Sequence, residues 1–198
     1  MAATRRLAAI LAADVVGYSR LMGADEEGTH ERFQAHVREV IDPKTREHHG
    51  RIVKTTGDGV LAEFASVVDA VRCAAEIQRA MVDRDLEFAE ARRLRFRIGV
   101  NLGDLIVDSG DIYGDAVNIA VRLEGLAAPG GICVSGTVRD HIGDRLPYLR
   151  GHGRAERQEH RAAGTGLCVA TPRPVGRGGK RVVRRECTAS VDRRSAFY

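Results

Sequence analysis

No apolar run in this 198-residue chain approaches the ~20 residues that a membrane-spanning helix needs, so we expect no membrane segment. Residues 4–13 have the basic start and small side chains of a signal peptide, but their apolar centre is short and Asp14 follows at once. A first β-strand is the better interpretation, and we predict a cytoplasmic protein. The four cysteines show neither metal-ligand spacing nor a dense framework, which favours reduced, buried thiols.

Aromatic residues are scarce as well, at 5% of the chain, and positive charge is concentrated at one end. Residues 149–198 hold 12 Lys+Arg against 4 Asp+Glu, whereas residues 1–148 hold 19 against 23. The net charge of +4 therefore comes from a basic tail joined to an acidic body, and the body gives no support for nucleic-acid binding. The near absence of aromatic stacking residues also disfavours an RNA-binding tail, so we predict no nucleic-acid partner.

With 43% hydrophobic residues, the chain is long enough to bury one core. Its apolar periodicity alternates between that of strands and that of helices along residues 1–148. The first six elements follow the βαββαβ order of the ferredoxin-like fold, so we predict an α+β domain with an antiparallel sheet and helices packed on one of its faces. The expected strands are residues 6–16, 50–64 (a hairpin), 94–101, 105–107 and 131–134, and the expected helices are residues 25–47, 66–86, 113–127 and 135–142.

Two carboxylates follow apolar strands and are candidates for a metal site. Asp14 ends the first strand, and Asp58 lies in the Gly57-Asp58-Gly59 turn of the hairpin. Such oxygen ligands suit Mg²⁺, which proteins usually hold with one or two carboxylates plus substrate phosphates. Lys54, four residues before Asp58, is expected on the same face of its strand. The plain alternative is that Asp58 is only a type I′ turn residue and Asp14 a solvated strand end.

A third segment carries an amide and a guanidinium on one predicted helix. Asn118 and Arg122 are four residues apart within residues 111–122, and therefore lie on one helical face. Side by side, they can orient a ribose and neutralise charge on a phosphate undergoing displacement. Alone the pair is weak evidence, because both residue types are common on solvated helix faces.

Together the three segments resemble the class III adenylate/guanylate cyclase catalytic domain. The resemblance covers about residues 6–148 and depends on three motifs that occur in the family's order, each with the family's internal spacing. We therefore predict a cyclase catalytic domain at residues 1–148, followed by a tail at residues 149–198. The motifs are Ala13-Asp-Val-Val-Gly-Tyr18, Val53-Lys-Thr-Thr-Gly-Asp-Gly59 and Asp111-Ile-Tyr-Gly-Asp-Ala-Val-Asn-Ile-Ala-Val-Arg122.

The resemblance implies an adenylate cyclase that converts ATP to 3′,5′-cyclic AMP and pyrophosphate in cyclic-nucleotide signalling. It implies that Asp14 and Asp58 hold two Mg²⁺ (or Mn²⁺) ions per site, with the carbonyl of Val15 as a further ligand. Lys54 and Asp111 look like the pair that reads adenine, which favours ATP over GTP. The other implied roles are phosphate binding by the amides of Val15, Val16, Gly17 and Tyr18, ribose positioning by Asn118 and transition-state stabilisation by Arg122.

The same resemblance implies a homodimer with composite active sites. In the family, the metal ligands come from one subunit, and the asparagine and arginine come from the other. A chain with both sets is therefore expected to form two equivalent sites across a two-fold interface and to be inactive as a monomer. The segment between Gly103 and Asp111 is shorter than in many relatives, which leaves the details of the dimer contact open.

Residues 149–198 do not continue the family pattern, which would add a strand, a lysine that grips the triphosphate and a final strand. Residues 149–168 can be encoded so that a shift of one base reads Phe-Glu-Asp-Met-Gly-Glu-Gln-Ser-Val-Lys-Asn-Ile-Ala-Arg-Pro-Val-Arg-Val-Tyr, which is the expected continuation. We predict that the chain leaves its frame near Leu149, and that the tail is irregular and disordered. The gene sequence tests this. The alternative function is a non-catalytic cyclase-like domain that binds nucleotide or dimerises without turnover.

Overall fold

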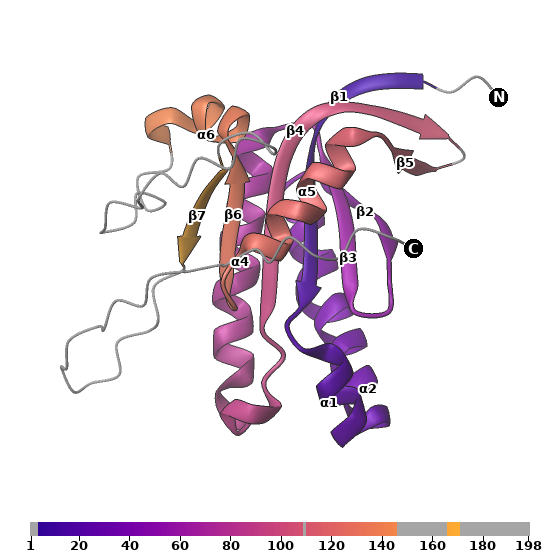
Figure 1. The fold of residues 1–198 in the computed structure, drawn as a ribbon, viewed down its shortest axis with the longest axis vertical. Helices are drawn as coiled ribbons and strands as arrows, with labels where there is room; N and C mark the ends of the chain where they lie inside the picture. The colour runs from indigo at the N-terminus through magenta and orange to yellow at the C-terminus, as the bar shows by residue number, and fades with distance from the viewer. Residues whose placement is uncertain (1–3, 109, 146–165, 171–198) are drawn as a thin grey trace, which may run out of the picture.

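The computed structural model describes residues 4–108, 110–145 and 166–170, and a twisted sheet lies at its centre (Figure 1). The first four strands in chain order are neighbours in the sheet, and the later strands extend it on one side. The strands are β1 (Thr4–Val15), β2 (Gly50–Thr55), β3 (Gly59–Phe64), β4 (Phe96–Asp108), β5 (Asp111–Tyr113), β6 (Gly131–Ser135) and β7 (Gly166–Ala170).

The strand order β2-β3-β1-β4, antiparallel at every step, is that of a ferredoxin-like βαββαβ unit. This confirms the predicted fold class. Beyond it, β6 pairs with β4 in parallel at residues 98–100, and β5 folds back on the end of β4. A parallel neighbour needs a crossover connection, and the helix α5 (Asp115–Leu126) provides it.

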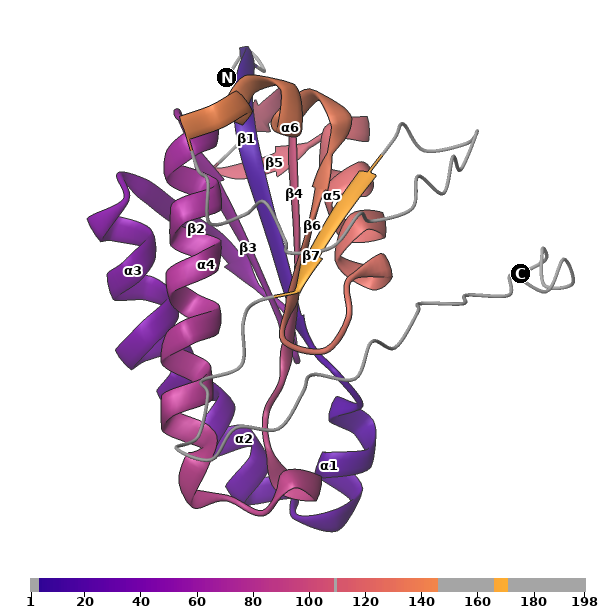
Figure 2. The ribbon, with the colours of Figure 1, turned by 90° about the vertical axis from the view of Figure 1, so that its left-hand side faces the viewer.

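Helices cover both faces of the sheet, with α4 (Val67–Arg84) on one side and α5 on the other, so the prediction of helices on one face alone is wrong (Figure 2). Alternate β1 residues are buried in different clusters, because successive strand side chains point to opposite faces. Burial on both faces explains why the first strand is apolar almost without interruption. No helix in the described part of the chain is long and apolar enough to cross a bilayer. The other helices are α1 (Tyr18–Ala24), α2 (Glu26–His36), α3 (Asp42–Glu47), α4 (Val67–Arg84) and α6 (Gly136–Ile142).

Within residues 1–148 the structure differs from the predicted elements in three places. The helix predicted at residues 25–47 is interrupted by a π-helical turn at Val37–Ile41, and a short helix, α1, precedes it. The strands predicted at residues 94–101 and 105–107 are one continuous strand, β4, because its glycine at position 103 does not end the pairing with β1. The third predicted helix begins at Asp115 and not at Tyr113, because Tyr113 belongs to β5 and pairs with Ile106 of β4.

Helix α5 lies directly on β4, and two glycines permit this contact. A Cβ atom added to Gly99 would come 2.2 Å from the carbonyl oxygen of Ala120 and 2.3 Å from the amide nitrogen of Glu124. At Gly103 it would come 2.7 Å from the Cβ of Ala116. Glycine therefore lets the helix backbone approach the strand closely. This contact fixes the height of α5 above the sheet.

One short segment of the tail belongs to the sheet. Residues 166–170 form β7, which pairs antiparallel with β6 from Ser135 to Gly131. The prediction of an irregular tail is therefore wrong for these five residues. This pairing satisfies the backbone groups along this edge of β6. The shifted-frame segment from Leu149 to residue 165, and the predicted disorder of residues 171–198, lie outside the described residues.

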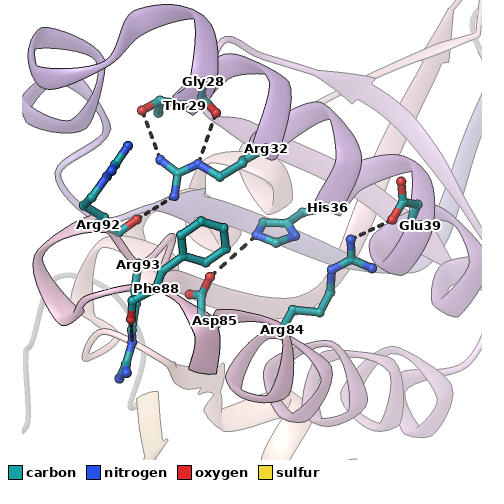
Figure 3. A network of polar contacts seen from close by, with 10 residues as sticks. All are labelled: Gly28, Thr29, Arg32, His36, Glu39, Arg84, Asp85, Phe88, Arg92 and Arg93. Atoms are coloured by element: carbon teal, nitrogen blue, oxygen red, sulfur yellow. Dashed lines mark hydrogen bonds and ion pairs between the residues drawn. The ribbon is translucent and has the colours of Figure 1, made fainter.

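Two ionisable side chains are buried together where α2 meets the end of α4. His36 and Asp85 are 4% and 5% exposed, and His36 Nε2 lies 3.8 Å from Asp85 Oδ1 (Figure 3). Burial, together with the nearby Arg84 and Arg32 guanidinium groups, lowers the pKa of His36 to about 4. Burial also raises the pKa of Asp85 to about 6. The two groups therefore affect the pH dependence of stability in opposite directions.

His36 is expected to make the protein less stable as the pH falls from neutral towards 4. Its folded pKa of about 4 lies below the ordinary value of 6.5, so its contribution is present above pH 6.5 and is lost as the pH falls through 4. Asp85 contributes the reverse, because its pKa is raised. His36→Gln should therefore lose less stability between pH 6.5 and 4.5, by about 2 kcal/mol. Urea unfolding at both pH values measures this, and equal losses in the two proteins would contradict it.

Candidate functional site

Asp14 is the penultimate residue of β1 and lies between two neighbouring strands. It pairs with Gly59 of β3 on one side and with Arg97 of β4 on the other. Strand alternation places its side chain on the face that α5 covers, as for Ala12. The side chain is 22% exposed. A carboxylate is thus fixed at the end of the sheet and remains accessible to a ligand.

Asp58 reaches the same end of the sheet from the connection between β2 and β3. The Val15 N–H donates to the Asp58 carbonyl at 3.1 Å, which fixes this connection beside the end of β1. Partial burial, together with the negative charge of Asp14, raises the pKa of Asp58. The φ angles of Gly57, Asp58 and Gly59 are not positive, so the connection is not a type I′ turn. The interpretation of Asp58 as such a turn residue is therefore wrong.

The two carboxylates fit a divalent cation that also binds a substrate. They lie close enough for Asp14 to disfavour the ionised form of Asp58, and a cation would relieve that repulsion. Among the described residues, no three or more His, Cys, Asp or Glu side chains form a metal-binding group. Two carboxylates with the remaining ligands supplied by phosphates and water is the usual arrangement for Mg²⁺.

Two charged residues outside the motifs complete this end of the sheet. Arg97 Nη2 lies 2.6 Å from Asp14 Oδ2 and 3.1 Å from Glu124 Oε1. Glu124 is 7% exposed on the inner face of α5, and burial, with the charge of Asp14, raises its pKa to about 7. Neither residue is predicted as a site residue from the sequence. Only Glu124 carries a sequence signal, a charge four residues after buried Ala120, where helical periodicity predicts an apolar side chain. Arg97 carries none, because the apolar/polar alternation of residues 94–101 predicts a polar side chain at this position.

The chain turns from β1 into α1 through Gly17. Its φ of 68° lies in the left-handed region that glycine adopts without strain. The N–H groups of Val15 and Val16 already donate to backbone carbonyls, at 3.1 and 2.9 Å. The amides of Gly17 and Tyr18 are therefore the ones left for a phosphate. The Tyr18 hydroxyl is buried without a hydrogen-bond partner among the described residues.

Lys54 and Asp111 are brought together although 57 residues separate them. Lys54 Nζ lies 3.1 Å from Asp111 Oδ2, and the Ile112 N–H donates to Asp111 Oδ1 at 2.7 Å. Both hydrogen bonds lower the pKa of Asp111, and the one from the Ile112 backbone has the larger effect. Lys54 Nζ also lies 5.9 Å from the centre of the Tyr113 ring. A donor and an acceptor thus stand side by side, as recognition of a base edge requires.

Asn118 and Arg122 lie on the outer face of α5, and both are exposed. The inner face of the same helix carries the buried residues Ala116, Ala120 and Glu124. Because Asp14 lies on the sheet beneath the inner face, one chain does not bring the outer pair onto the carboxylates. The pair is therefore free to face a second molecule.

Comparisons with known proteins agree on one family. Residues 2–156 match the family model described as the adenylate and guanylate cyclase catalytic domain. The chain is 51% identical over 141 residues to putative adenylate cyclase 3 of Rhizobium meliloti (strain 1021). The aligned region covers 71% of this chain and 24% of that protein. The chain therefore spans about a quarter of the length of this relative.

Solved structures share the fold. An adenylate/guanylate cyclase/hydrolase from Silicibacter pomeroyi matches with a TM-score of 0.76 at 43% identity, covering 85% of this chain and 99% of that one. The guanylyl cyclase Cya2 matches with a TM-score of 0.70 at 21% identity, covering 88% and 97%. At that identity the second likeness concerns the fold alone.

Proposed function

Because this chain belongs to the adenylate and guanylate cyclase catalytic domain family, we propose that it converts ATP to 3′,5′-cyclic AMP and pyrophosphate. In this reaction the ribose 3′-oxygen attacks the α-phosphorus and loses its proton. The bond from the α-phosphorus to the β-phosphate oxygen breaks, and pyrophosphate leaves. The observation that carries the choice of ATP is the ion pair between Lys54 and Asp111.

Asp14 and Asp58 would hold two Mg²⁺ or Mn²⁺ ions per site, with the Val15 carbonyl as a further ligand. When bound, the ions lower the pKa of the 3′-hydroxyl and neutralise charge on the leaving pyrophosphate. The convergence of the two carboxylates at this end of the sheet supports this role. The amides of Gly17 and Tyr18 would bind phosphate oxygens.

The Lys54–Asp111 pair would read the base. Lys54 can donate to adenine N1, and Asp111 can accept from the 6-amino group. Guanine presents an N–H and a carbonyl oxygen at these positions. The donor Lys54 would then face the donor N–H, and the acceptor Asp111 would face the acceptor oxygen. A mismatch of this kind is disfavoured, because polar groups are left unpaired.

Asn118 and Arg122 would act on the nucleotide held by a second copy of the chain. Asn118 would orient the ribose, and Arg122 would stabilise charge on the phosphorus undergoing displacement. Their position on the outer face of α5 supports a homodimer with two composite sites. Its two-fold symmetry would make the sites equivalent.

The purified chain should use ATP in preference to GTP, with a kcat/KM at least about tenfold higher. Parallel assays with Mg²⁺ or Mn²⁺, with cyclic AMP and cyclic GMP measured by mass spectrometry, determine the ratio. Lys54→Ala and Asp111→Ala should each bring the ratio towards one. Asp83→Ala, which removes an exposed acid of α4, is the matched control. Equal use of ATP and GTP by the unaltered chain would contradict the adenine assignment.

The second candidate is a cyclase-like domain that binds nucleotide or dimerises without turnover. One observation favours it: after Tyr148 the sequence lacks the lysine-containing segment of the family. We propose that a frame change near Leu149 caused this loss. Nucleotide binding without product in this chain, together with cyclic AMP formation after the frame is restored, would select this candidate.

A further inference from the structure

Glu124 is a buried acid of α5 to which the proposed reaction gives no role. Its side chain is 9% exposed and faces β4, whereas Asn118 and Arg122 on the same helix lie on the outer face. Glu124 Oε1 lies 3.1 Å from Arg97 Nη2. Because a buried carboxylate is costly unless it is paired, this contact sets where both side chains can lie.

Arg97 is held from two different elements, by hydrogen bonds to Asp14 and the Gly125 carbonyl and by an ion pair with Glu124, whose Oε1 has no hydrogen-bond partner among the described residues. Its Nη2 lies 2.6 Å from Asp14 Oδ2 on β1 and 3.1 Å from Glu124 Oε1 on α5. Its Nη1 donates to the Gly125 carbonyl of α5 at 3.4 Å. The guanidinium is thus tied to the helix as well as to the candidate metal ligand.

A divalent cation at Asp14 competes with this guanidinium for the same carboxylate. Arg97 is 28% exposed, and its Nε is buried without a hydrogen-bond partner among the described residues. Suppose that Asp14 were the only acidic partner of Arg97. Binding of a cation to Asp14 would then leave the largely buried positive charge of Arg97 without a counter-charge, which is strongly unfavourable. Glu124 remains as a partner and removes most of that penalty.

We infer that Glu124 is a positioning residue that keeps Arg97 paired when Asp14 binds the cation, and thereby strengthens cation binding. The inference rests on the metal role proposed above. It also gives α5 two tasks. The outer face of α5 would serve the partner's nucleotide, and its inner face would support the cation site of its own chain.

Mn²⁺ binding to the purified full chain without nucleotide tests this, at a pH above the raised pKa of Glu124 and with free Mn²⁺ measured by electron paramagnetic resonance. Glu124→Gln keeps the shape and removes the charge, whereas Glu124→Asp keeps the charge and shortens the reach to Arg97. Both should raise the Kd for Mn²⁺ about tenfold, since loss of a group that orients a metal ligand typically costs 10–100-fold. Asp115→Asn, an exposed acid in the first turn of α5, should leave the Kd within about twofold.

An unchanged Kd in Glu124→Gln would overturn the inference. An unchanged Kd for Mn²⁺ in Glu124→Asp would also overturn it, because the negative charge at this position, without the contact to Arg97, would then explain the role of Glu124. Circular dichroism verifies the fold, and should Glu124→Asp unfold, Glu124→Gln alone decides. Absence of Mn²⁺ binding by the unaltered chain would also overturn the inference. If the unaltered chain and its variants bind Mn²⁺ with the expected Kd values but the unaltered chain forms no cyclic AMP, the proposed function is contradicted and this inference is not.

Discussion

Asp58→Ala is expected to abolish cyclic AMP formation, lowering kcat with ATP by at least about a thousandfold. Asp58 and Asp14 are the two carboxylates that converge at this end of the sheet. A cation that neutralises developing charge contributes several kcal/mol, and one carboxylate would hold it poorly. Initial rates measured across a range of Mg²⁺ and Mn²⁺ concentrations would separate weak cation binding from loss of the reaction itself.

The stability of this variant provides an independent control. Burial and the charge of Asp14 raise the pKa of Asp58, so its ionised form at neutral pH is unfavourable in the fold. Asp58→Ala should therefore unfold at the same temperature as the unaltered chain or at a higher one. Asp83→Ala, on the exposed surface of α4, should retain full activity. Activity that survives in Asp58→Ala would refute the metal role.

Mixing two inactive variants, Asp58→Ala and Arg122→Ala, is expected to restore activity to about a quarter of that of the unaltered chain. If subunits exchange at random, half of the dimers contain one chain of each variant. In such a dimer, one site carries both defects and the other carries neither. One intact site in half of the dimers gives a quarter of the original number of sites.

The matched control mixes Asp58→Ala with Asp14→Ala. Both changes affect the same half of the site, so no mixed dimer has an intact site and no activity should return. The recovery should also grow with total protein concentration, because it depends on dimer formation. Absence of recovery in the first mixture, with subunit exchange confirmed by tagged chains, would count against the shared-site homodimer.

Local sequence was sufficient for most helices and strands. The apolar stripe of residues 66–86 predicts α4, and the structure shows Ser66 capping it, with the Asp69 N–H donating to Ser66 Oγ at 3.3 Å. The order of elements was sufficient for the ferredoxin-like unit. The π-helical turn at Val37–Ile41 could not be predicted, because it depends on how this helix packs against the rest of the fold.

The residue types that carry the chemistry and their spacing within each motif can be read from the chain, because residues close in sequence on one strand or helix have a known relative position. Which distant residues meet depends on the tertiary structure. It joined Lys54 to Asp111, placed Arg97 on Asp14 across 83 residues, and turned Glu124 inward. Periodicity shows which side of an element is buried, but strand register and the close seating of α5 on β4 determine what each buried charge contacts.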